Sequence, residues 1–305
     1  MPELTETEII SRYRKIYGLD ESIGIEHALK HWDLERQLTL KLLETTPSNR
    51  WEIFSQSYSE LYHQLPWLNK SEENDRQLIL SQWKKLISPN SRIFEIGSGK
   101  AELLKYLSSV GHHCTATEIT PERGKYHAQG DENLSWHITD GIHLAEFEPP
   151  EYYDVVISTG VIEHFHPEDI VLHFENAKKI LRPGGRYIFT TPHIASGPHD
   201  LSKAFGYEKA VCMHLREYDY PSLGAILQEA GYGEISAIFP PSKIYRQLGL
   251  TKESRVYFKW LNLIDKAQQA LPIPSNMRSF LRNFTKVLLM PDNIWLSART
   301  PHTKT

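Results

Sequence analysis

Residues 92–101 read Arg-Ile-Phe-Glu-Ile-Gly-Ser-Gly-Lys-Ala, an apolar strand that runs into a Gly-x-Gly turn and then a helix. Glycine allows the backbone to turn tightly and to approach a ligand without a Cβ in the way. No Lys-Ser or Lys-Thr pair follows the turn, so the motif is not a nucleoside-triphosphate phosphate loop. The stretch predicts a strand, turn and helix that bind a ligand, although a lone Gly-x-Gly motif is a weak signal.

Short apolar strands alternate with helices around this motif. We expect strands at 92–96, 113–118, 134–139, 153–158, 186–190, 233–239 and 293–298. Helices are expected between them at 101–109, 121–127, 167–181 and 222–230. This alternation is typical of a parallel sheet covered on both faces, with the ligand beyond the carboxyl ends of the strands. The sequence therefore predicts an α/β fold with a doubly wound, mostly parallel, seven-stranded sheet.

The rest of the chain predicts helices. Apolar residues recur at spacings of three and four over 23–43, 51–65 and 77–86. A further mostly helical stretch separates the last two strands and is longer than a connecting loop requires. We therefore expect four parts: an N-terminal helical extension at 1–88, a Rossmann-like ligand-binding domain at 89–240, a basic helical insertion at 241–290, and the last strand with a tail at 291–305.

Acidic residues follow successive strands. Glu118 ends the second expected strand, 23 residues after Glu95, where a carboxylate can accept both hydroxyls of a ribose. Asp140, followed by Gly141, ends the third strand. An NAD(P)-dependent oxidoreductase would account for Glu118 but gives no reason for the Asp140-Gly141 pair.

The run from Ile93 to Ala298 resembles the class I S-adenosylmethionine-dependent methyltransferases, especially the broad small-molecule group that includes ubiquinone and menaquinone biosynthetic enzymes. The motifs that carry the resemblance are 94–99, 154–158 with Gly160-Val161-Ile162-Glu163-His164 after it, and Leu181-Arg182-Pro183-Gly184-Gly185 before the fifth strand. Ala101 departs from the family's usual glycine. The resemblance covers about two thirds of the chain.

The resemblance implies S-adenosylmethionine as the cofactor. Glu95 would support the loop near the methionine amino group, Glu118 would bind the ribose and Asp140 the adenine amino group. The other cofactor-binding residues expected are Gly97, Ser98, Gly99, Ile119, Gly141, Ser158 and Thr159. The implied reaction is direct displacement, in which an acceptor atom attacks the methyl group and S-adenosylhomocysteine leaves.

Five histidines fall in the loops expected beside the acceptor: His164, His166, His193, His199 and His214. Histidine is the natural base near neutral pH. We expect His164 first, and His214 second, to take the acceptor proton, with orientation of the loop as the alternative role of His164. The histidines with Asp200 also suggest a metal, but Gly160 replaces a carboxylate that some quinone-pathway relatives use. No metal site is therefore predicted.

These features predict a small-molecule methyltransferase, with oxygen as the first choice of acceptor atom and nitrogen or carbon next. Short segments also resemble enzymes that modify glycans or secondary metabolites, without fixing a substrate. Two alternatives remain, an NAD(P)-dependent oxidoreductase and a non-catalytic S-adenosylmethionine-binding protein. The sequence does not indicate an oligomeric state.

Bulk composition excludes other classes. The net charge of −4 and pI near 6.4 give no general attraction to nucleic acid. No apolar run approaches the roughly 20 residues that cross a bilayer, and the N-terminus has no secretory pattern, so a cytoplasmic protein is predicted, with peripheral membrane contact left open. Two isolated cysteines predict neither disulfides nor structural zinc.

Two segments leave alternatives open. Residues 241–290 carry nine Lys or Arg against two acids, a net +7. This charge is either a solvated face or a contact with an anionic acceptor, lipid or partner. The helical extension and the insertion also carry apolar stripes that are either packing or a cover over the acceptor: Trp51, Phe54, Tyr58, Tyr62 and Trp67, and Val256, Trp260, Ile264 and Ala267.

Overall fold

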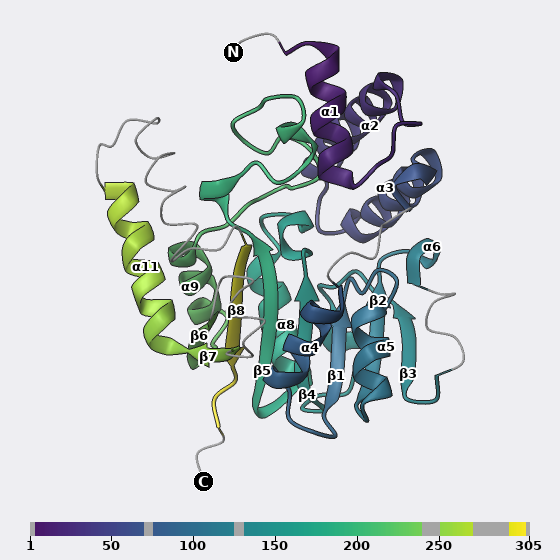
Figure 1. Ribbon diagram of the computed structural model, residues 1–305. Helices are drawn as coiled ribbons and strands as arrows, with labels where there is room; N and C mark the ends of the chain where they lie inside the picture. The colour runs from purple at the N-terminus through teal and green to yellow at the C-terminus, as the bar shows by residue number, and fades with distance from the viewer. Residues whose placement is uncertain (1–3, 70–75, 125–130, 240–250, 271–292, 303–305) are drawn as a thin grey trace.

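An eight-stranded sheet forms the centre of the molecule (Figure 1). The computed structural model describes residues 4–69, 76–124, 131–239, 251–270 and 293–302. All seven predicted strands are present, and a short edge strand that the sequence did not predict makes the eighth. The strands are β1 (Arg92–Ile96), β2 (His113–Glu118), β3 (Leu134–Ile138), β4 (Tyr153–Thr159), β5 (Leu181–Pro192), β6 (Glu234–Phe239), β7 (Lys252–Ser254) and β8 (Asn293–Arg299).

The strand order is β3-β2-β1-β4-β5-β8-β6-β7. Strands β1 to β5 pair in parallel, and β8 lies antiparallel between β5 and β6. The predicted doubly wound, mostly parallel α/β fold is therefore confirmed. Because β1 to β5 run in one direction, the residues that follow them meet at one edge of the sheet.

Helices cover both faces because side chains alternate along the strands. Phe94 and Ile96 pack on one face with α8 (Ile170–Ile180) and α9 (Tyr220–Glu229), whereas Ile93 packs on the other. That other face is covered by α4 (Arg76–Leu86) and α5 (Glu102–Ser109). The short helices α6 (Pro121–Gly124) and α7 (Leu144–Phe147) follow β2 and β3. Both cysteines are buried free thiols.

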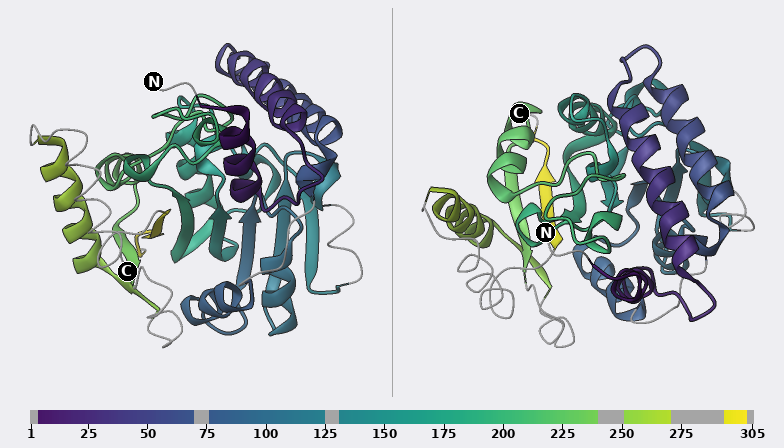
Figure 2. Two further views of the ribbon diagram at one scale, coloured as in Figure 1. Left: turned by 45° about the horizontal axis from the view of Figure 1, so that its top comes forward. Right: turned by 90° about the horizontal axis from the view of Figure 1, so that it is seen from above.

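Three N-terminal helices form a cap at one end of the sheet (Figures 1 and 2). The cap consists of α1 (Glu6–Tyr17), α2 (Ile25–Leu43) and α3 (Arg50–Gln64), followed by the short turn η1 (Pro66–Asn69). Its apolar face packs on the segment between β5 and α9, where Met213 joins one cluster and Leu201 another. No helix among the described residues combines the length and apolar character needed to cross a membrane.

The described part of the basic insertion lies at the opposite side of the sheet from the cap's long helices. Helix α11 (Arg255–Ala270) packs beside α9 and β6 (Figures 1 and 2), with Phe258, Leu261 and Asp265 buried. The predicted apolar stripe is wrong at Val256, which is 78% exposed, and at Ala267, which is also exposed, because the buried face is rotated toward Phe258 and Leu261. Trp260 and Ile264 of the stripe do pack against the core. Residues 241–250 and 271–290, with five of the nine predicted basic residues, lie outside the described residues.

A buried polar chain links α8 to the sheet. Nδ1 of His173 donates to the Gly141 carbonyl at 2.6 Å, and Nε2 lies 2.8 Å from the hydroxyl of Tyr187. That hydroxyl lies 2.9 Å from Oγ of Ser158. His173, Tyr187 and Ser158 are all 0% exposed. Because Gly141 follows Asp140, this chain fixes the backbone at the end of β3.

The buried imidazole predicts a loss of stability in acid. Burial lowers the pKa of His173 to about 4, against the opposing hydrogen bond to Gly141. An unfolded histidine titrates near pH 6.5, so between about pH 6.5 and 4 the unfolded state binds a proton that the folded state does not. The contribution of neutral His173 is therefore complete above pH 6.5 and is lost as the pH falls toward 4.

Urea unfolding at pH 7 and pH 4.5 measures this effect. The free energy of unfolding of the wild type should fall by about 2 kcal/mol more than that of His173→Gln. The exposed His137→Gln variant should retain the wild-type dependence. Equal pH dependence in wild type and His173→Gln would contradict the assignment.

Candidate active site

A cavity of 640 Å³ opens at the carboxyl edge of the parallel strands. One part, the glycine-turn half, is formed by the loops after β1, β2, β3 and β4, and includes Gly97, Glu118 and Asp140. The other part, the cap half, lies between the cap and the segment before α9. The residues that line the cap half are Tyr17, Glu35, Phe54, Tyr58, Leu61, Tyr62, Leu68, His164, His199, Asp200, Met213 and His214.

The turn after β1 requires glycine at two positions. Gly97 and Gly99 have φ of 64° and 55°, a left-handed conformation that glycine adopts without a Cβ clash. A Cβ on Gly97 would lie 2.6 Å from Cγ2 of Val161, so the loop after β4 packs directly on the turn. A Cβ on Gly99 would meet no atom within 4 Å, which leaves the backbone open toward the cavity. Ala101 adopts the same conformation at a φ of 54° although it is not glycine.

Two carboxylates stand beside the turn. Oε1 of Glu118 accepts from the Gly99 backbone N–H at 2.6 Å, and Oε2 accepts from the N–H of Ile119 at 3.3 Å. Glu95 is 4% exposed, and burial together with the charge of Glu118 holds its pKa well above the usual range. Oε2 of Glu95 and Oγ of Ser98 are buried and have no hydrogen-bond partner among the described residues. Unpaired buried groups are costly, so a ligand that donates to them would be stabilised here.

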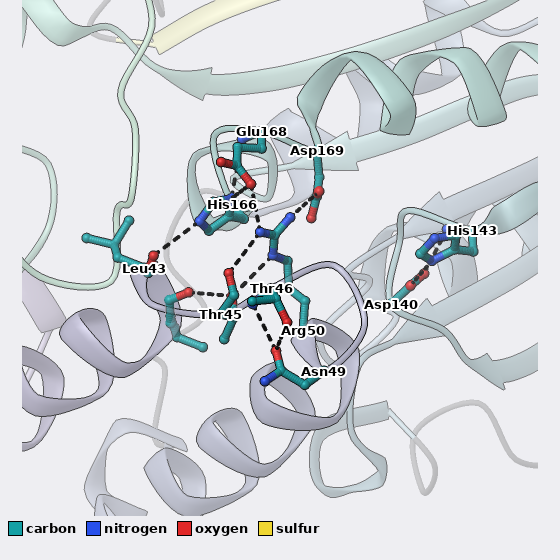
Figure 3. Close-up of polar contacts among 11 residues, drawn as sticks. Leu43, Thr45, Thr46, Asn49, Arg50, Asp140, His143, His166, Glu168 and Asp169 are labelled. Carbon is teal, nitrogen blue, oxygen red and sulfur yellow. Dashed lines mark hydrogen bonds and ion pairs between the residues drawn. The ribbon is translucent and has the colours of Figure 1, made fainter.

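Asp140, in the loop after β3, lines the cavity. Figure 3 shows its side chain beside that of His143. Oδ1 of Asp140 accepts from the backbone N–H groups of Ile142 and His143 at 2.8 and 2.9 Å. Its Oδ2 lies 2.5 Å from Nδ1 of His143, and this hydrogen bond raises the pKa of that histidine. Gly141 has a φ of 73°, and a Cβ there would lie 2.9 Å from Phe165. Asp140 is thus held in one orientation.

The other predicted cofactor-binding residues differ in whether they line the cavity. Ile119 and Thr159 line the cavity, as Ser98 does. Ser158 is not among the lining residues, because its side chain points into the core toward Tyr187. Any contact of Ser158 with a cofactor would have to use its backbone.

The five predicted histidines also separate into two groups. His164, His199 and His214 line the cap half of the cavity. His166 instead lies against the α2–α3 connection, with Nε2 3.4 Å from the Leu43 carbonyl (Figure 3). His193 is buried against α11, where Nε2 donates to Asp265 at 3.0 Å.

His164 and His214 form the chemical centre of the cap half, with ring centroids 4.8 Å apart. Nδ1 of His164 donates to the Met213 carbonyl at 2.9 Å, so the neutral ring carries its lone pair on Nε2. Nδ1 of His214 donates to Oε1 of Glu217 at 3.1 Å. Burial alone lowers the pKa of His214, but this hydrogen bond and the nearby charges of Glu163 raise it above the usual value.

Glu163 completes this centre. It is 2% exposed, burial raises its pKa, and Oε2 accepts from the hydroxyl of Thr191 at 2.9 Å. Its carboxylate and the ring nitrogens of His164 and His214 lie within 4.8 Å of one another. Such a set could move a proton or hold a divalent ion. The absence of a metal from this site stays a prediction.

The cap supplies residues that the sequence did not identify. Glu35 of α2 and Tyr17 of α1 line the cavity, and Tyr58 and Tyr62 of the predicted aromatic stripe do so as well. For Glu35, the available signal was a polar residue between Leu34 and Leu38 on an apolar helix face. That spacing alone does not show whether the face meets a core or a cavity.

An ion-pair cluster fastens the cap to the residues before α8 (Figure 3). Arg50, at the start of α3, donates from Nη2 to Glu168 at 2.9 Å and pairs through Nη1 with Asp169. Its Nε and Nη2 also donate to the hydroxyl and the carbonyl of Thr45, each at 3.1 Å. The guanidinium is almost fully buried, so the cluster fixes the α2–α3 connection against the residues before α8.

Comparison with known proteins agrees with this geometry. A family described as a methyltransferase domain matches residues 63–236, more than half of the 305 residues. No curated protein matches the chain.

Two solved structures illustrate the likeness in fold. A SAM-dependent methyltransferase from Archaeoglobus fulgidus is 14% identical, with a TM-score of 0.51 over 80% of this chain and 99% of that one. The 1,6-didemethyltoxoflavin-N1-methyltransferase of Burkholderia thailandensis, with bound 1,6-didemethyltoxoflavin and S-adenosylhomocysteine, is 16% identical. Its TM-score is 0.50 over 84% of this chain and 91% of that one.

The chain belongs to the methyltransferase-domain family. Family and fold together confirm the prediction of a class I S-adenosylmethionine-dependent methyltransferase, with S-adenosylmethionine as cofactor. They argue against the oxidoreductase alternative. The narrower resemblance to quinone-biosynthetic enzymes stays a prediction.

Removal of the Glu118 carboxylate tests the prediction that this residue of the glycine-turn half binds the ribose of the cofactor. In Glu118→Ala the Gly99 N–H loses its acceptor and a ribose would lose its carboxylate, so S-adenosylhomocysteine should bind more weakly by about 1.5 to 3 kcal/mol. Isothermal calorimetry measures this change. Glu132→Ala, an exposed carboxylate at the opposite end of the sheet, should bind like the wild type. Wild-type affinity in Glu118→Ala would remove the ribose assignment.

Proposed function

We propose that this chain transfers the methyl group of S-adenosylmethionine to a small-molecule acceptor, at a hydroxyl oxygen first and at nitrogen or carbon as alternatives. The observation that carries the proposal is the single cavity that joins the Gly97–Gly99 turn to the His164–His214 pair beneath the cap. A non-catalytic cofactor-binding protein would have no need of an open acceptor side with a base in it.

In this proposal the glycine-turn half holds the cofactor. Glu118 binds the ribose hydroxyls and Asp140 the adenine amino group. Glu95 and Ser98, whose buried oxygens lack partners in the described structure, lie beside the methionine part. The cofactor supplies an electrophilic methyl group, so the protein contributes mainly alignment and exclusion of water.

His164 is the proposed base. Its Nδ1–H is held by the Met213 carbonyl, which leaves Nε2 as the nitrogen that can accept a proton. As the acceptor oxygen forms its bond to the methyl carbon, the sulfur–carbon bond breaks and the hydroxyl proton passes to Nε2. His214 is less suited to this role, because its raised pKa favours the protonated ring. It orients the acceptor and balances the charge of Glu163.

The basic insertion does not support an anionic acceptor. Arg255, Lys259 and Lys266 lie on α11, which does not line the cavity. Arg255 is instead paired with Glu234 on β6. The predicted effect of these charges on acceptor binding therefore has no structural route within the described residues, and a solvated surface accounts for their positions.

Incubation of the protein with methyl-labelled S-adenosylmethionine and a metabolite extract tests the activity. Mass spectrometry should find a labelled small molecule and a stoichiometric amount of S-adenosylhomocysteine. Cofactor binding without any labelled product would favour the non-catalytic alternative.

Replacement of His164 tests its proposed role as the base. His164→Ala should lower turnover by about 10² to 10⁴-fold, with nearly unchanged affinity for S-adenosylhomocysteine. His137→Ala, which removes an exposed histidine outside the cavity, serves as the control. Full turnover of His164→Ala across pH 6 to 9 would eliminate His164 both as base and as orienter.

A further inference from the structure

A buried hydrogen-bond chain crosses the cap and ends at the cavity. Nε1 of Trp67 donates to the hydroxyl of Tyr13 at 2.8 Å, and this hydroxyl lies 3.0 Å from Nδ1 of His31. Nε2 of His31 lies 2.8 Å from Oε1 of Glu35. Tyr13 and His31 are 0% exposed and Glu35 is 6% exposed.

The direction of this chain follows from the chemistry of its ends. An indole N–H only donates and a carboxylate only accepts. His31 therefore donates from Nε2 to Glu35, and its Nδ1 accepts from the hydroxyl of Tyr13. His31 thus satisfies Oε1 of Glu35 and leaves Oε2 to other donors. The chain thus fixes the orientation of the Glu35 carboxylate.

The other carboxylate oxygen of Glu35 is not part of this hydrogen-bond chain. Oε2 is buried and has no hydrogen-bond partner among the described residues, although Glu35 lines the cavity. The hydroxyl of Tyr58, also a lining residue, is buried and unpartnered in the same sense. Burial and nearby acids, Glu35 among them, raise the pKa of Tyr58 well above its usual value, so it stays a neutral hydroxyl.

The charged residues around the cavity indicate which kind of ligand group would bind to Oε2 of Glu35 and to the hydroxyl of Tyr58. Lys100, on the glycine turn, is the one Lys or Arg among the described residues that line the cavity. The nearest basic residue along α2, Arg36, donates to the Val211 carbonyl and stacks on Trp32 instead. A buried carboxylate in a cavity that tyrosines also line is suited to an ammonium group, which supplies both N–H donors and positive charge. A neutral hydroxyl would supply only the donor.

We propose that the acceptor carries an ammonium group, which binds between the carboxylate of Glu35 and the hydroxyl of Tyr58. This proposal deepens the proposed function and rests on it. An ammonium nitrogen has no lone pair, so it anchors the molecule while a different atom is methylated. Glu35 is then a specificity-determining residue, and Trp67, Tyr13 and His31 position it.

Thermal unfolding of the protein saturated with S-adenosylhomocysteine tests the subsite with matched probes: ethanolamine against ethylene glycol, and tyramine against 4-(2-hydroxyethyl)phenol. Because a ligand that binds only the folded state raises the Tm, the amines should raise it in a saturable manner. The alcohols of the same shape should not.

Three variants test whether Glu35 and Tyr58 are responsible for amine binding. Glu35→Gln keeps an oxygen to accept from His31 but removes the charge, so the apparent affinity for the amines should fall at least tenfold. Asp33→Asn makes the same chemical change at an exposed position of α2 and should behave like the wild type. Tyr58→Phe removes a hydroxyl that has no partner in the described structure, so it should fold and should also weaken amine binding.

Each outcome decides between the two proposals. Equal shifts from amines and alcohols, no shift from any probe, or amine binding unchanged in both Glu35→Gln and Tyr58→Phe would overturn the ammonium subsite. Calorimetry with S-adenosylhomocysteine on the same samples, and amine titrations without it, separate this result from failure of the proposed function. Cofactor binding without amine binding would reject the subsite alone.

Discussion

The turn at Gly97 and Gly99 is the constraint on which the rest of the site depends. Its left-handed backbone brings the Ser98 N–H to the Thr117 carbonyl at 2.9 Å and the Gly99 N–H to Glu118 at 2.6 Å, which joins the ends of β1 and β2. Val161 occupies the space that a Cβ on Gly97 would fill. The loop that carries His164 therefore packs on the same turn that opens its backbone toward the cavity.

The cap supplies one half of the cavity, which is the half that we propose for the acceptor. Its helices do not merely cover the cavity, because Arg50 fastens them to the residues before α8 and Met213 packs into their apolar face. The same Met213 contributes the carbonyl that fixes the ring of His164. The position of the cap and the orientation of the His164 ring are therefore coupled through one residue.

Several buried polar atoms without a hydrogen-bond partner in the described structure lie on the wall of the cavity. Buried groups without partners are rare in folded proteins, since each costs about 1–3 kcal/mol. Among the described residues thirteen side-chain atoms are of this kind, and four of them belong to residues that line this one cavity: Ser98 and Glu95 in the glycine-turn half, Tyr58 and Glu35 in the cap half. Their place on the cavity wall, together with the lack of a partner, supports a role for these four in binding a ligand.

The sequence by itself determined the sheet and the acids beside it, because short apolar runs that alternate with helices predict a parallel sheet, and parallel strands end at one edge. Glu118 and Asp140 could be placed from that rule alone. Only the tertiary structure decided which histidines face the cavity, since His164 and His166 stand two apart in a loop that has no periodicity. The tertiary structure also decided that Glu35 faces the cavity and that α11 lies away from it. The direction of an amphipathic helix face depends on the element that packs against it, and that element is far away in the chain.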